Sequence, residues 1–337
     1  MKRMFLYVGG CLLVAMCVVY GLFFSSISTA DETVFVKIDA DDNIDSVYTK
    51  VKAISHAVPY AGFKLAAKVS GYANRVRTGR YEVSTSIGSL RLLRHLMNRQ
   101  QAPVRLTIPT VRTTDRLAAE LSKQLMPDSV AWVKVLQDKD LCKSLGYDTT
   151  TIMCVFIPNT YEIYWDVTPQ KFLKKMKQEN DAFWTDSRRQ KAADAGLTPN
   201  EVIVVASIVE QETANNAEKP MIAGMYLNRY HKGMKLQADP TVKFATRQFQ
   251  LRRIGGSILF TDSPYNTYKY AGLPPGPICI PSMASIEAVL NYVHHDYLYM
   301  CAKEDFSGTH NFARTYAEHQ QNAQKYTDAL NKRGIME

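Results

Sequence analysis

Two glutamates near the end of one apolar segment are the residues of this chain best placed for acid–base chemistry. Residues 198–213 end in Glu210-Gln211-Glu212-Thr213. On a helix, at about 100° per residue, the two carboxyls point about 200° apart and cannot share a face. Either carboxyl, held above apolar side chains in a cleft, would have its charged form desolvated and its pKa raised, which suits a general acid. The alternatives are a solvated carboxyl at a helix end and half of a buried ion pair.

The helix that carries these acids is expected to be central and buried. Thr198-Pro199-Asn200-Glu201 is a capping box with proline at the first helical position, so the helix begins there. Most of the following residues, 202–209, are apolar, a pattern typical of a helix that is covered on every side. A second helix is expected over 217–231, and it ends at Gly233.

Three loops after these helices combine tyrosine with amide and hydroxyl side chains. Tyrosine faces provide apolar stacking, and the amides and hydroxyls provide hydrogen bonds, so such loops suit a sugar polymer. The same residue types also form ordinary turns, and each loop alone decides little. The loops are Leu236–Thr241, Ser263–Tyr268 and Gly272–Pro277.

Several other chemistries are excluded by missing patterns. The sequence has no G-x-S-x-G elbow, no H-E-x-x-H, no Walker loop and no Rossmann glycine pattern. His294 and His295 are adjacent and point apart on a helix or strand, so we expect no metal site and no cofactor. Outside the first thirty residues four cysteines remain, without C-x-x-C spacing; whether they form disulfides is left open by their positions. They are Cys142, Cys154, Cys279 and Cys301.

The first thirty residues predict a single membrane helix. Lys2 and Arg3 precede an uncharged run over residues 4–24, long enough for the ~20 residues that cross a bilayer. Cations stay on the cytoplasmic side, so residues 1–3 form a cytoplasmic stub and the rest of the chain faces outward. The expected location is a bacterial inner membrane with a periplasmic ectodomain. A cleaved signal peptide ending near Ser28-Thr29-Ala30 is the alternative.

The net charge of the chain narrows its expected partners. The formal charge is +9, of which Lys2 and Arg3 supply two. A basic surface favours nucleic acid, anionic lipid or an acidic polymer. Outside the cytoplasm nucleic acid is excluded, and the cell wall, with carboxylates on its peptide stems, is the natural anionic partner. The alternative is that the charge only aids solubility.

The remaining chain predicts an α+β protein in at least two parts. Residues 31–106 form a small α+β module, with strands expected over 33–38, 79–83 and 104–108 and helices over 43–53, 60–70 and 88–99. Residues 107–337 form a larger mixed α/β domain. It begins with a helix near 115–125 and continues mostly helical over 130–197, interrupted by the turn-rich segment 156–161.

Five ordered segments resemble one known family, the MltG (YceG-like) endolytic murein transglycosylases. The first resembles A-S-I-[IV]-E-x-E-T and the second L-Q-[ST]-D-P-T-V. The last is similar to a G-x-H-x-F signature near the C-terminus. The resemblance is strong over 156–320 and covers the whole architecture of membrane helix, LysM-like module and catalytic domain. The segments are Ala206–Thr213, Leu236–Val242, Tyr265–Tyr268, Gly272–Ile278 and Gly308–Phe312.

The resemblance implies a reaction and a catalytic residue. The catalytic acid is the second glutamate of E-x-E-T, which is Glu212, and Glu210 is a supporting residue. The enzyme would break the β-1,4 bond between N-acetylmuramic acid and N-acetylglucosamine inside a glycan strand, leave a 1,6-anhydro-muramic end and so terminate strand elongation. Wall synthases are the implied protein partners. Substrate binding is assigned to Gln237, Asp239, Thr241, Tyr265, Asn266, Thr267 and His310.

The sequence departs from the family at two places, and two other functions stay open. Asn159 stands where the family often has aspartate, and Ala238 replaces a usual serine or threonine. Residues 74–81 of the LysM-like module mix cations with an aromatic and either grip the wall or form a solvated loop. A muramidase-type hydrolase would use Asp239 as a second carboxylate. A scaffold that binds the wall without cleaving it is the third reading.

Overall fold

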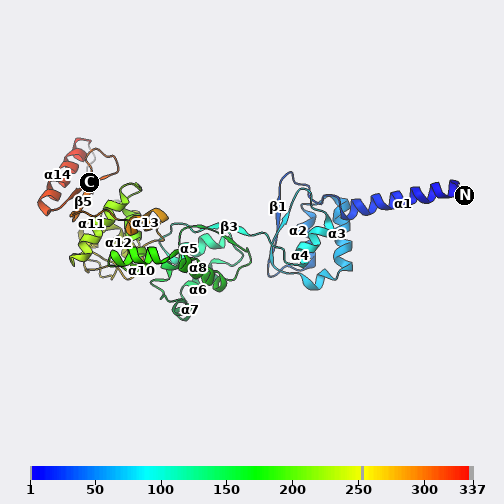
Figure 1. Ribbon diagram of the computed structural model, residues 1–337, viewed down its shortest axis with the longest axis horizontal. Coiled ribbons are helices and arrows are strands. Elements are labelled where there is room, and N and C mark those ends of the chain that lie inside the picture. The colour runs from blue at the N-terminus through cyan, green and yellow to red at the C-terminus, as the bar shows by residue number, and fades with distance from the viewer. Residues whose placement is uncertain (1, 252–253, 334–337) are drawn as a thin grey trace. The chain divides into compact units, whose positions relative to one another are not determined.

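The computed structural model describes residues 2–251 and 254–333 of the chain (Figure 1). The N-terminal residue of the expected stub over 1–3 and the last residues of the expected domain over 107–337 lie outside the described residues. The chain divides into two compact units. The first contains the residues up to Leu106 together with 124–127 and 161–168, and the second contains the others. The fold is a mixed α+β fold, as the sequence predicts.

The first unit begins with helix α1, Lys2–Phe23. Its span Arg3–Phe23 has a mean hydropathy of 2.2, so its length and composition fit a membrane span or a signal sequence. The end of α1 packs on helix α3, Ala57–Val69, where a side chain at Gly62 would collide with the Leu22 carbonyl. The Ser89 hydroxyl donates to that same carbonyl at 2.7 Å, which fixes the last turn of α1 to the unit.

The rest of the first unit packs helices on a strand pair. Strand β1, Val34–Ile38, runs antiparallel to β2, Gly79–Val83. Helices α2, Ile44–Lys52, and α4, Ser89–Met97, complete the core with α3. Apolar residues alternate along the strands and recur at helical spacing along the helices, so each element has one apolar face. The elements bury these faces by packing them together. Fully buried members include Ile38, Val47, Phe63, Tyr81 and Leu92.

The segment 74–81, which the sequence suggested for wall binding, is only partly exposed to solvent. Tyr81 is fully buried, and the Arg80 guanidinium lies 3.3 Å from the centre of the Phe35 ring. Asn74, Arg75 and Arg77 remain exposed. The aromatic that made this segment resemble a glycan grip therefore belongs to the core of the unit.

Short elements follow before the central helix of the second unit. Strand β3, Val104–Thr107, pairs with β4, Thr160–Ile163, so part of the expected turn-rich segment is a strand. The 3-10 turn η2 spans Ile152–Val155. The helices are α5 Thr114–Ser122, α6 Ser129–Leu136, α7 Lys139–Ser144, α8 Pro169–Phe183 and α9 Asp186–Asp194.

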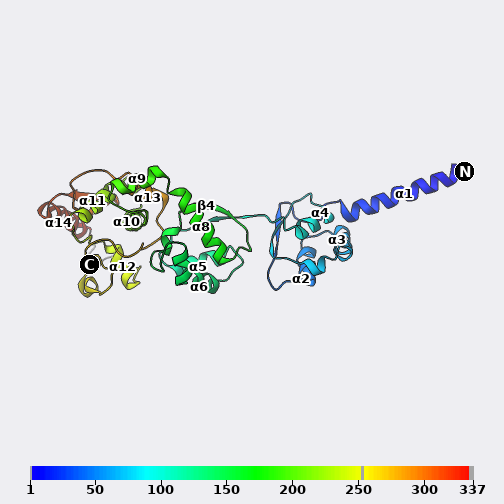
Figure 2. The same ribbon diagram turned by 60° about the horizontal axis from the view of Figure 1, so that its bottom comes forward.

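Helix α10, Pro199–Glu212, is the core helix of the second unit (Figure 2). Residues 202–209 are all buried. The capping box is present: the Thr198 hydroxyl accepts from the Glu201 N–H, and the Glu201 carboxylate accepts from the Thr198 N–H at 2.7 Å. The prediction of a central buried helix is confirmed. Around it pack α11 Lys219–His231, α12 Asp239–Thr246 and α13 Met283–Leu290.

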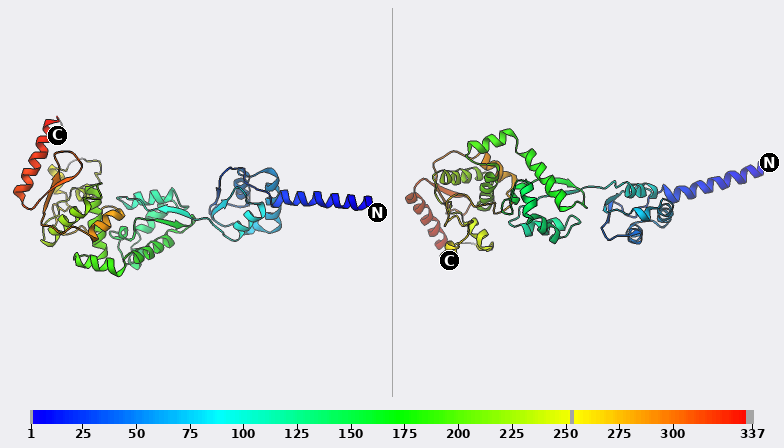
Figure 3. Two further views of the ribbon diagram at one scale, coloured as in Figure 1. Left: turned by 45° about the horizontal axis from the view of Figure 1, so that its top comes forward. Right: turned by 90° about the horizontal axis from the view of Figure 1, so that it is seen from below.

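A hairpin and a helix close the C-terminal part of the second unit (Figure 3). Strand β5, Tyr299–Ala302, pairs antiparallel with β6, His310–Ala313, and helix α14, Tyr316–Lys332, packs on β5. The turn η3, Gly256–Phe260, precedes α13. The hairpin and the first turns of α14 lie beside the end of α10.

Candidate active site

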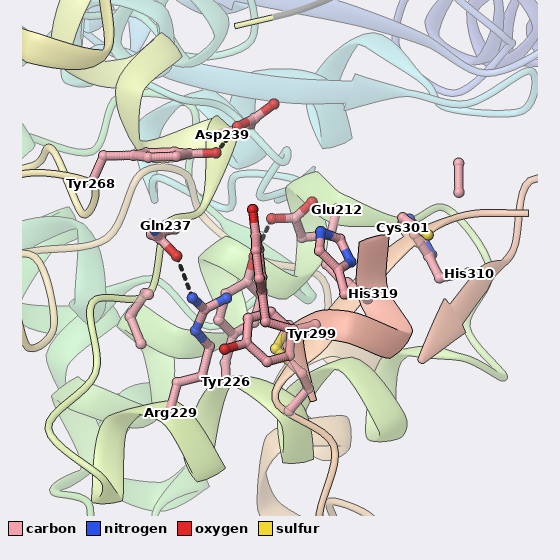
Figure 4. A pocket seen from close by; sticks show the side chains of 15 residues that line it. Glu212, Tyr226, Arg229, Gln237, Asp239, Tyr268, Tyr299, Cys301, His310 and His319 are labelled. Atoms are coloured by element: carbon pink, nitrogen blue, oxygen red, sulfur yellow. Dashed lines mark hydrogen bonds between the residues drawn. The ribbon is translucent and has the colours of Figure 1, made fainter. Parts of the chain in front are cut away.

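A cavity of about 410 Å³ lies at the C-terminal end of α10. Its wall comes from distant parts of the second unit: the end of α10, the helix α11, the segment 236–239, Tyr268, the hairpin β5–β6 and the start of α14. Figure 4 shows the polar side chains that point into it. The cavity therefore joins a buried helix to loops and strands that lie up to about a hundred residues away in the sequence.

Glu212, the last residue of α10, faces this cavity. The Tyr226 hydroxyl, from α11, donates a hydrogen bond to Glu212 Oε1. Burial raises the pKa of Glu212 to about 7, helped by the nearby charge of Asp239 and opposed by the Tyr226 hydrogen bond and by Lys243. A carboxyl tuned in this way holds its proton close to neutral pH, as a general acid must.

Glu210 points to a different place and has a different environment. Its Oε2 accepts from Lys219 Nζ at 3.0 Å, from the Ser282 backbone N–H at 3.1 Å and from the Ser282 and Ser285 hydroxyls, both at 2.5 Å. Burial acts to raise the pKa of Glu210, but these hydrogen bonds outweigh it and hold the pKa below its usual value. Glu210 is thus half of a buried ion pair, and Lys219 is 3% exposed.

Gln237 and Asp239 line the same cavity as Glu212. Asp239 Oδ1 accepts from the Tyr268 hydroxyl at 2.5 Å. Gln237 has a left-handed backbone, with φ of 51°, and its Oε1 accepts a hydrogen bond from Arg229. Its N–H donates to the Thr267 carbonyl at 3.1 Å, which holds this unusual turn in place.

His310 completes the group of sequence-predicted residues that meet at the cavity. It begins strand β6, and its Nδ1 lies 2.9 Å from Glu218 Oε2, while its backbone N–H donates to Glu218 Oε1 at 2.6 Å. Glu218 is buried, 8% exposed, and its contact with Nδ1 fixes the orientation of the His310 ring. The structure therefore brings together Glu212, Gln237, Asp239 and His310.

Three other predicted binding residues lie beneath the loops instead. Thr241 and Asn266 are 0% exposed and Thr267 is 2% exposed. The Thr267 hydroxyl accepts from the Ala238 N–H at 3.0 Å and contacts the Thr241 hydroxyl at 2.8 Å. The Asn266 amide donates to two backbone carbonyls. The polar groups of these three residues hold the loops together and do not line the cavity, and substrate binding by them stays a prediction.

Tyr265 also lies outside the cavity lining. Its ring packs on Phe244, with 4.7 Å between the ring centres, and burial raises the pKa of Tyr265 to about 12. Neither of the two family departures lines the cavity. Ala238 is fully buried, and Asn159 is an exposed residue whose carbonyl accepts from the Ile108 N–H at 3.1 Å.

Several cavity residues were not singled out from the sequence. Tyr226 and Arg229 lie three residues apart on α11, a polar pair on an otherwise apolar face, and this spacing was the available signal. Tyr299 and His319 come from segments that showed no pattern. Within residues 2–251 and 254–333, no three His, Cys, Asp or Glu side chains gather closely enough to hold a metal ion, and the six cysteines are free thiols.

A family model for YceG-like proteins matches residues 36–325 of this chain. The chain belongs to the YceG-like family. The match covers most of the first unit and nearly all of the second, and it includes every residue that lines the cavity.

Curated relatives of this YceG-like chain are named endolytic murein transglycosylases. One from Bacillus subtilis is 33% identical over 168 residues, which is 50% of this chain and 46% of the relative. One from Streptococcus pneumoniae is 26% identical over 338 residues, covering 88% of this chain and 59% of the relative. The chain thus spans about half of the length of these curated relatives.

A solved structure supports the same fold. A yceG-like protein from Listeria monocytogenes is 27% identical and superimposes with a TM-score of 0.56, and the match covers 87% of this chain and 99% of that one. The architecture described above is therefore the architecture of a YceG-like protein of known structure.

Proposed function

We propose that this YceG-like chain is an endolytic lytic transglycosylase that cleaves the glycan strands of peptidoglycan, with Glu212 as its acid. The observation that carries the proposal is the Glu212 carboxyl at the end of α10, which faces a polar cavity and whose pKa burial raises to about 7. The curated relatives are named for the same activity. Gln237, Asp239 and His310 lie where a bound strand would meet them.

The proposed reaction needs one residue that donates a proton in the first step and accepts another in the second. Protonated Glu212 donates its proton to the oxygen of the β-1,4 bond, and the bond from the anomeric carbon of N-acetylmuramic acid to that oxygen breaks. The 6-hydroxyl oxygen of the same sugar bonds to the anomeric carbon and loses its proton to the Glu212 carboxylate. The products are a free 4-hydroxyl and a 1,6-anhydro-muramic end, and Glu212 is again protonated.

The surroundings of Glu212 fit both halves of this cycle. The low-dielectric wall favours the protonated form before cleavage. The Tyr226 hydroxyl stabilises the carboxylate that exists between the two proton transfers, because it donates to Glu212 Oε1. Asp239 lies near enough to raise the pKa of Glu212 and supplies negative charge that would stabilise an oxocarbenium-like sugar.

A muramidase-type hydrolase is the second candidate, and one observation favours it. Asp239 lines the same cavity as Glu212, so a second carboxylate is present. The Tyr268 hydroxyl occupies one of its oxygens, at 2.5 Å, which leaves the other oxygen to activate a water. The stereochemistry and the ends of the products separate the two reactions.

The other parts of the chain receive roles that follow from the same proposal. Residues 4–24 anchor the protein in the inner membrane as a single span, and residues 31–106 are a LysM-like module that positions the catalytic domain, 107–337, over newly made strands outside the cytoplasm. Cleavage there would end strand elongation, and wall synthases are the proposed partners. A signal peptide in place of the anchor is tested by whether the full-length chain fractionates with membranes.

The test is digestion of purified peptidoglycan by the full chain in detergent, followed by mass analysis of the new ends. Glu212→Gln is compared with Glu287→Gln, a control at a partly exposed ion pair outside the cavity. Anhydro-muramic ends from the unaltered chain and the control, but not from Glu212→Gln, are the expected result. Reducing ends would replace this proposal with the hydrolase, and binding without cleavage would replace it with a wall-binding scaffold.

A further inference from the structure

Two residues that line the cavity each have a buried polar atom without a hydrogen-bond partner. Among the described residues three buried side-chain nitrogen or oxygen atoms are unpartnered, and two of them, Arg229 Nε and His319 Nδ1, belong to residues that line this cavity. The third is the Tyr72 hydroxyl in the first unit. Buried polar groups are almost always hydrogen-bonded, so two exceptions in one cavity point to a missing ligand.

Arg229 is also a buried cation without an anion. It is 7% exposed, and within the part of the chain that the structure describes no carboxylate lies at ion-pair distance from it. It donates one hydrogen bond to the neutral Gln237 amide and lies 5.4 Å from the centre of the Tyr299 ring. The other buried cation of this region, Lys219, has the Glu210 carboxylate at 3.0 Å.

This arrangement costs stability unless a ligand compensates for it. A guanidinium keeps its charge in proteins, so Arg229 cannot escape by losing a proton. Leaving a buried charge unpaired is strongly unfavourable, whereas a carboxylate matches the two-pronged geometry of arginine and neutralises it. The imbalance therefore indicates an anionic ligand more than a neutral one.

His319 extends the same wall. Its ring stacks on Tyr299, with 5.4 Å between the ring centres and 22° between the planes. Tyr299 thus lies against Arg229 and against His319, and Figure 4 shows the three side chains with Glu212 around one hollow. Burial lowers the pKa of His319, and the Arg229 charge lowers it further, so His319 serves as a neutral hydrogen-bonding group.

We propose that the wall formed by Arg229, Tyr299 and His319 binds a carboxylate of the peptide stem on the strand being cleaved. The inference rests on the proposed function and identifies the stem carboxylate as the feature of the substrate that this wall recognises. Where a stem is attached, the lactyl group of N-acetylmuramic acid is amide-linked, so the sugars carry neutral groups and the carboxylates of the strand are on the peptide stems. A carboxylate bound in this cavity lies beside Glu212, so the site selects peptide-bearing sugars next to the cleaved bond.

The first experiment tests the ligand without changing Arg229. The full chain carrying Glu212→Gln, in detergent, is titrated calorimetrically with a disaccharide-peptide that has free carboxylates and with the same molecule fully amidated. A charge-assisted hydrogen bond predicts roughly 10- to 100-fold tighter binding of the carboxylate form, and this preference should weaken as salt is raised. Equal affinities for the two ligands would overturn the inference.

The second experiment assigns the preference to Arg229. Arg229→Gln in the same background should bind the two ligands with equal affinity, and Arg229→Lys should keep part of the difference, since it retains charge but not the planar fork. Arg116→Gln, at an arginine whose side chain is 64% exposed outside the cavity, should keep all of it. A full preference retained in Arg229→Gln would contradict the assignment. Thermal unfolding of each variant identifies any that fail to fold, and the ligand pair then still decides.

The two proposals fail in different ways. Binding is measured in the Glu212→Gln variant and does not depend on cleavage. A preference for the carboxylate ligand therefore supports the proposed carboxylate site even if digestion shows no transglycosylase activity. Anhydro-muramic ends released at equal rates from peptide-bearing strands with free stem carboxylates and from strands with amidated ones would overturn the inference and leave the proposed function standing.

Discussion

The two sides of the end of helix α10 differ in how completely their polar groups are satisfied. On one side Glu210 accepts four hydrogen bonds, including one from a buried lysine. On the other side Glu212 receives one, from Tyr226, and the nearby Arg229 and His319 each have an unpartnered buried nitrogen. The two glutamates are only two residues apart, yet their pKa values are shifted in opposite directions.

This difference separates what stabilises the protein from what performs its chemistry. The Glu210 cluster ties α10 to α11 and to the start of α13, because Lys219 begins α11, Ser282 is the N-cap of α13 and Ser285 lies in its first turn. The Glu212 cavity is left incomplete by the protein alone, which is the condition in which a substrate can complete it. A change on the first side should therefore alter stability, and a change on the second side should alter activity.

The largest expected effect is the loss of cleavage in Glu212→Gln. Removal of a general acid should lower the rate by roughly 10³-fold, because glutamine cannot donate the proton. The measurement is the initial rate of release of soluble fragments from peptidoglycan. A variant that keeps more than about a tenth of the rate would remove Glu212 from the mechanism.

The next effect is on stability. Glu210→Ala leaves Lys219 buried without its anion and removes the acceptor for Ser282 and Ser285, so the free energy of unfolding should fall by about 3 kcal/mol. Denaturant unfolding measures it. Glu287→Ala, which breaks a more exposed pair with Arg188, should cost less than about 1 kcal/mol. Equal losses in the two variants would mean that the Glu210 cluster has no special structural role.

A smaller effect concerns stability and pH. A carboxyl whose pKa is raised from 4.5 to about 7 favours folding below pH 4.5, and that advantage is lost as the pH rises to 7. Glu212→Gln cannot ionise, so relative to the unaltered chain it should gain about 3 kcal/mol between pH 4.5 and 8. Thermal unfolding across this range is the measurement, and a pH-independent difference would contradict the raised pKa.

The smallest effect comes from the one hydrogen bond that Glu212 receives. Tyr226→Phe removes a donor that favours the charged form, so the pKa of Glu212 should rise further, and the alkaline limb of the cleavage rate should move up by about 1 pH unit. Tyr164→Phe, at an exposed tyrosine, serves as the control. A limb that stays in place would show that Tyr226 does not act on the proton of Glu212.

Much of this comparison could be predicted from the sequence. The capping box at Thr198 and the apolar run after it specified a buried α10, and helical geometry required the two glutamates to face different ways. Glu210 forms an ion pair with the buried Lys219, which is one of the alternatives that the sequence left open. These features are local, so spacing along the chain is enough to reveal them.

The rest of the site depends on contacts that spacing does not encode. Thr241 and Thr267 are separated by 26 residues, and only the folded loops show that their hydroxyls bond to each other and not to a ligand. Arg229 and His319 are brought together by a hairpin and a helix at the end of the chain. Strand β4 was also missed, since Thr160–Ile163 is too short for its alternation to stand out beside Pro158 and Asn159.

The most direct test of this account is a site-specific titration of the two carboxyls. The full chain, with its glutamate side-chain carboxyls labelled with ¹³C, is titrated by NMR, and Glu210→Gln and Glu212→Gln assign the two signals. The account predicts that Glu212 titrates near pH 7 and Glu210 below 4.5. If both carboxyls titrate near 4.5, the cavity does not tune Glu212, and the proposed acid and the distinction between the two sides are both contradicted.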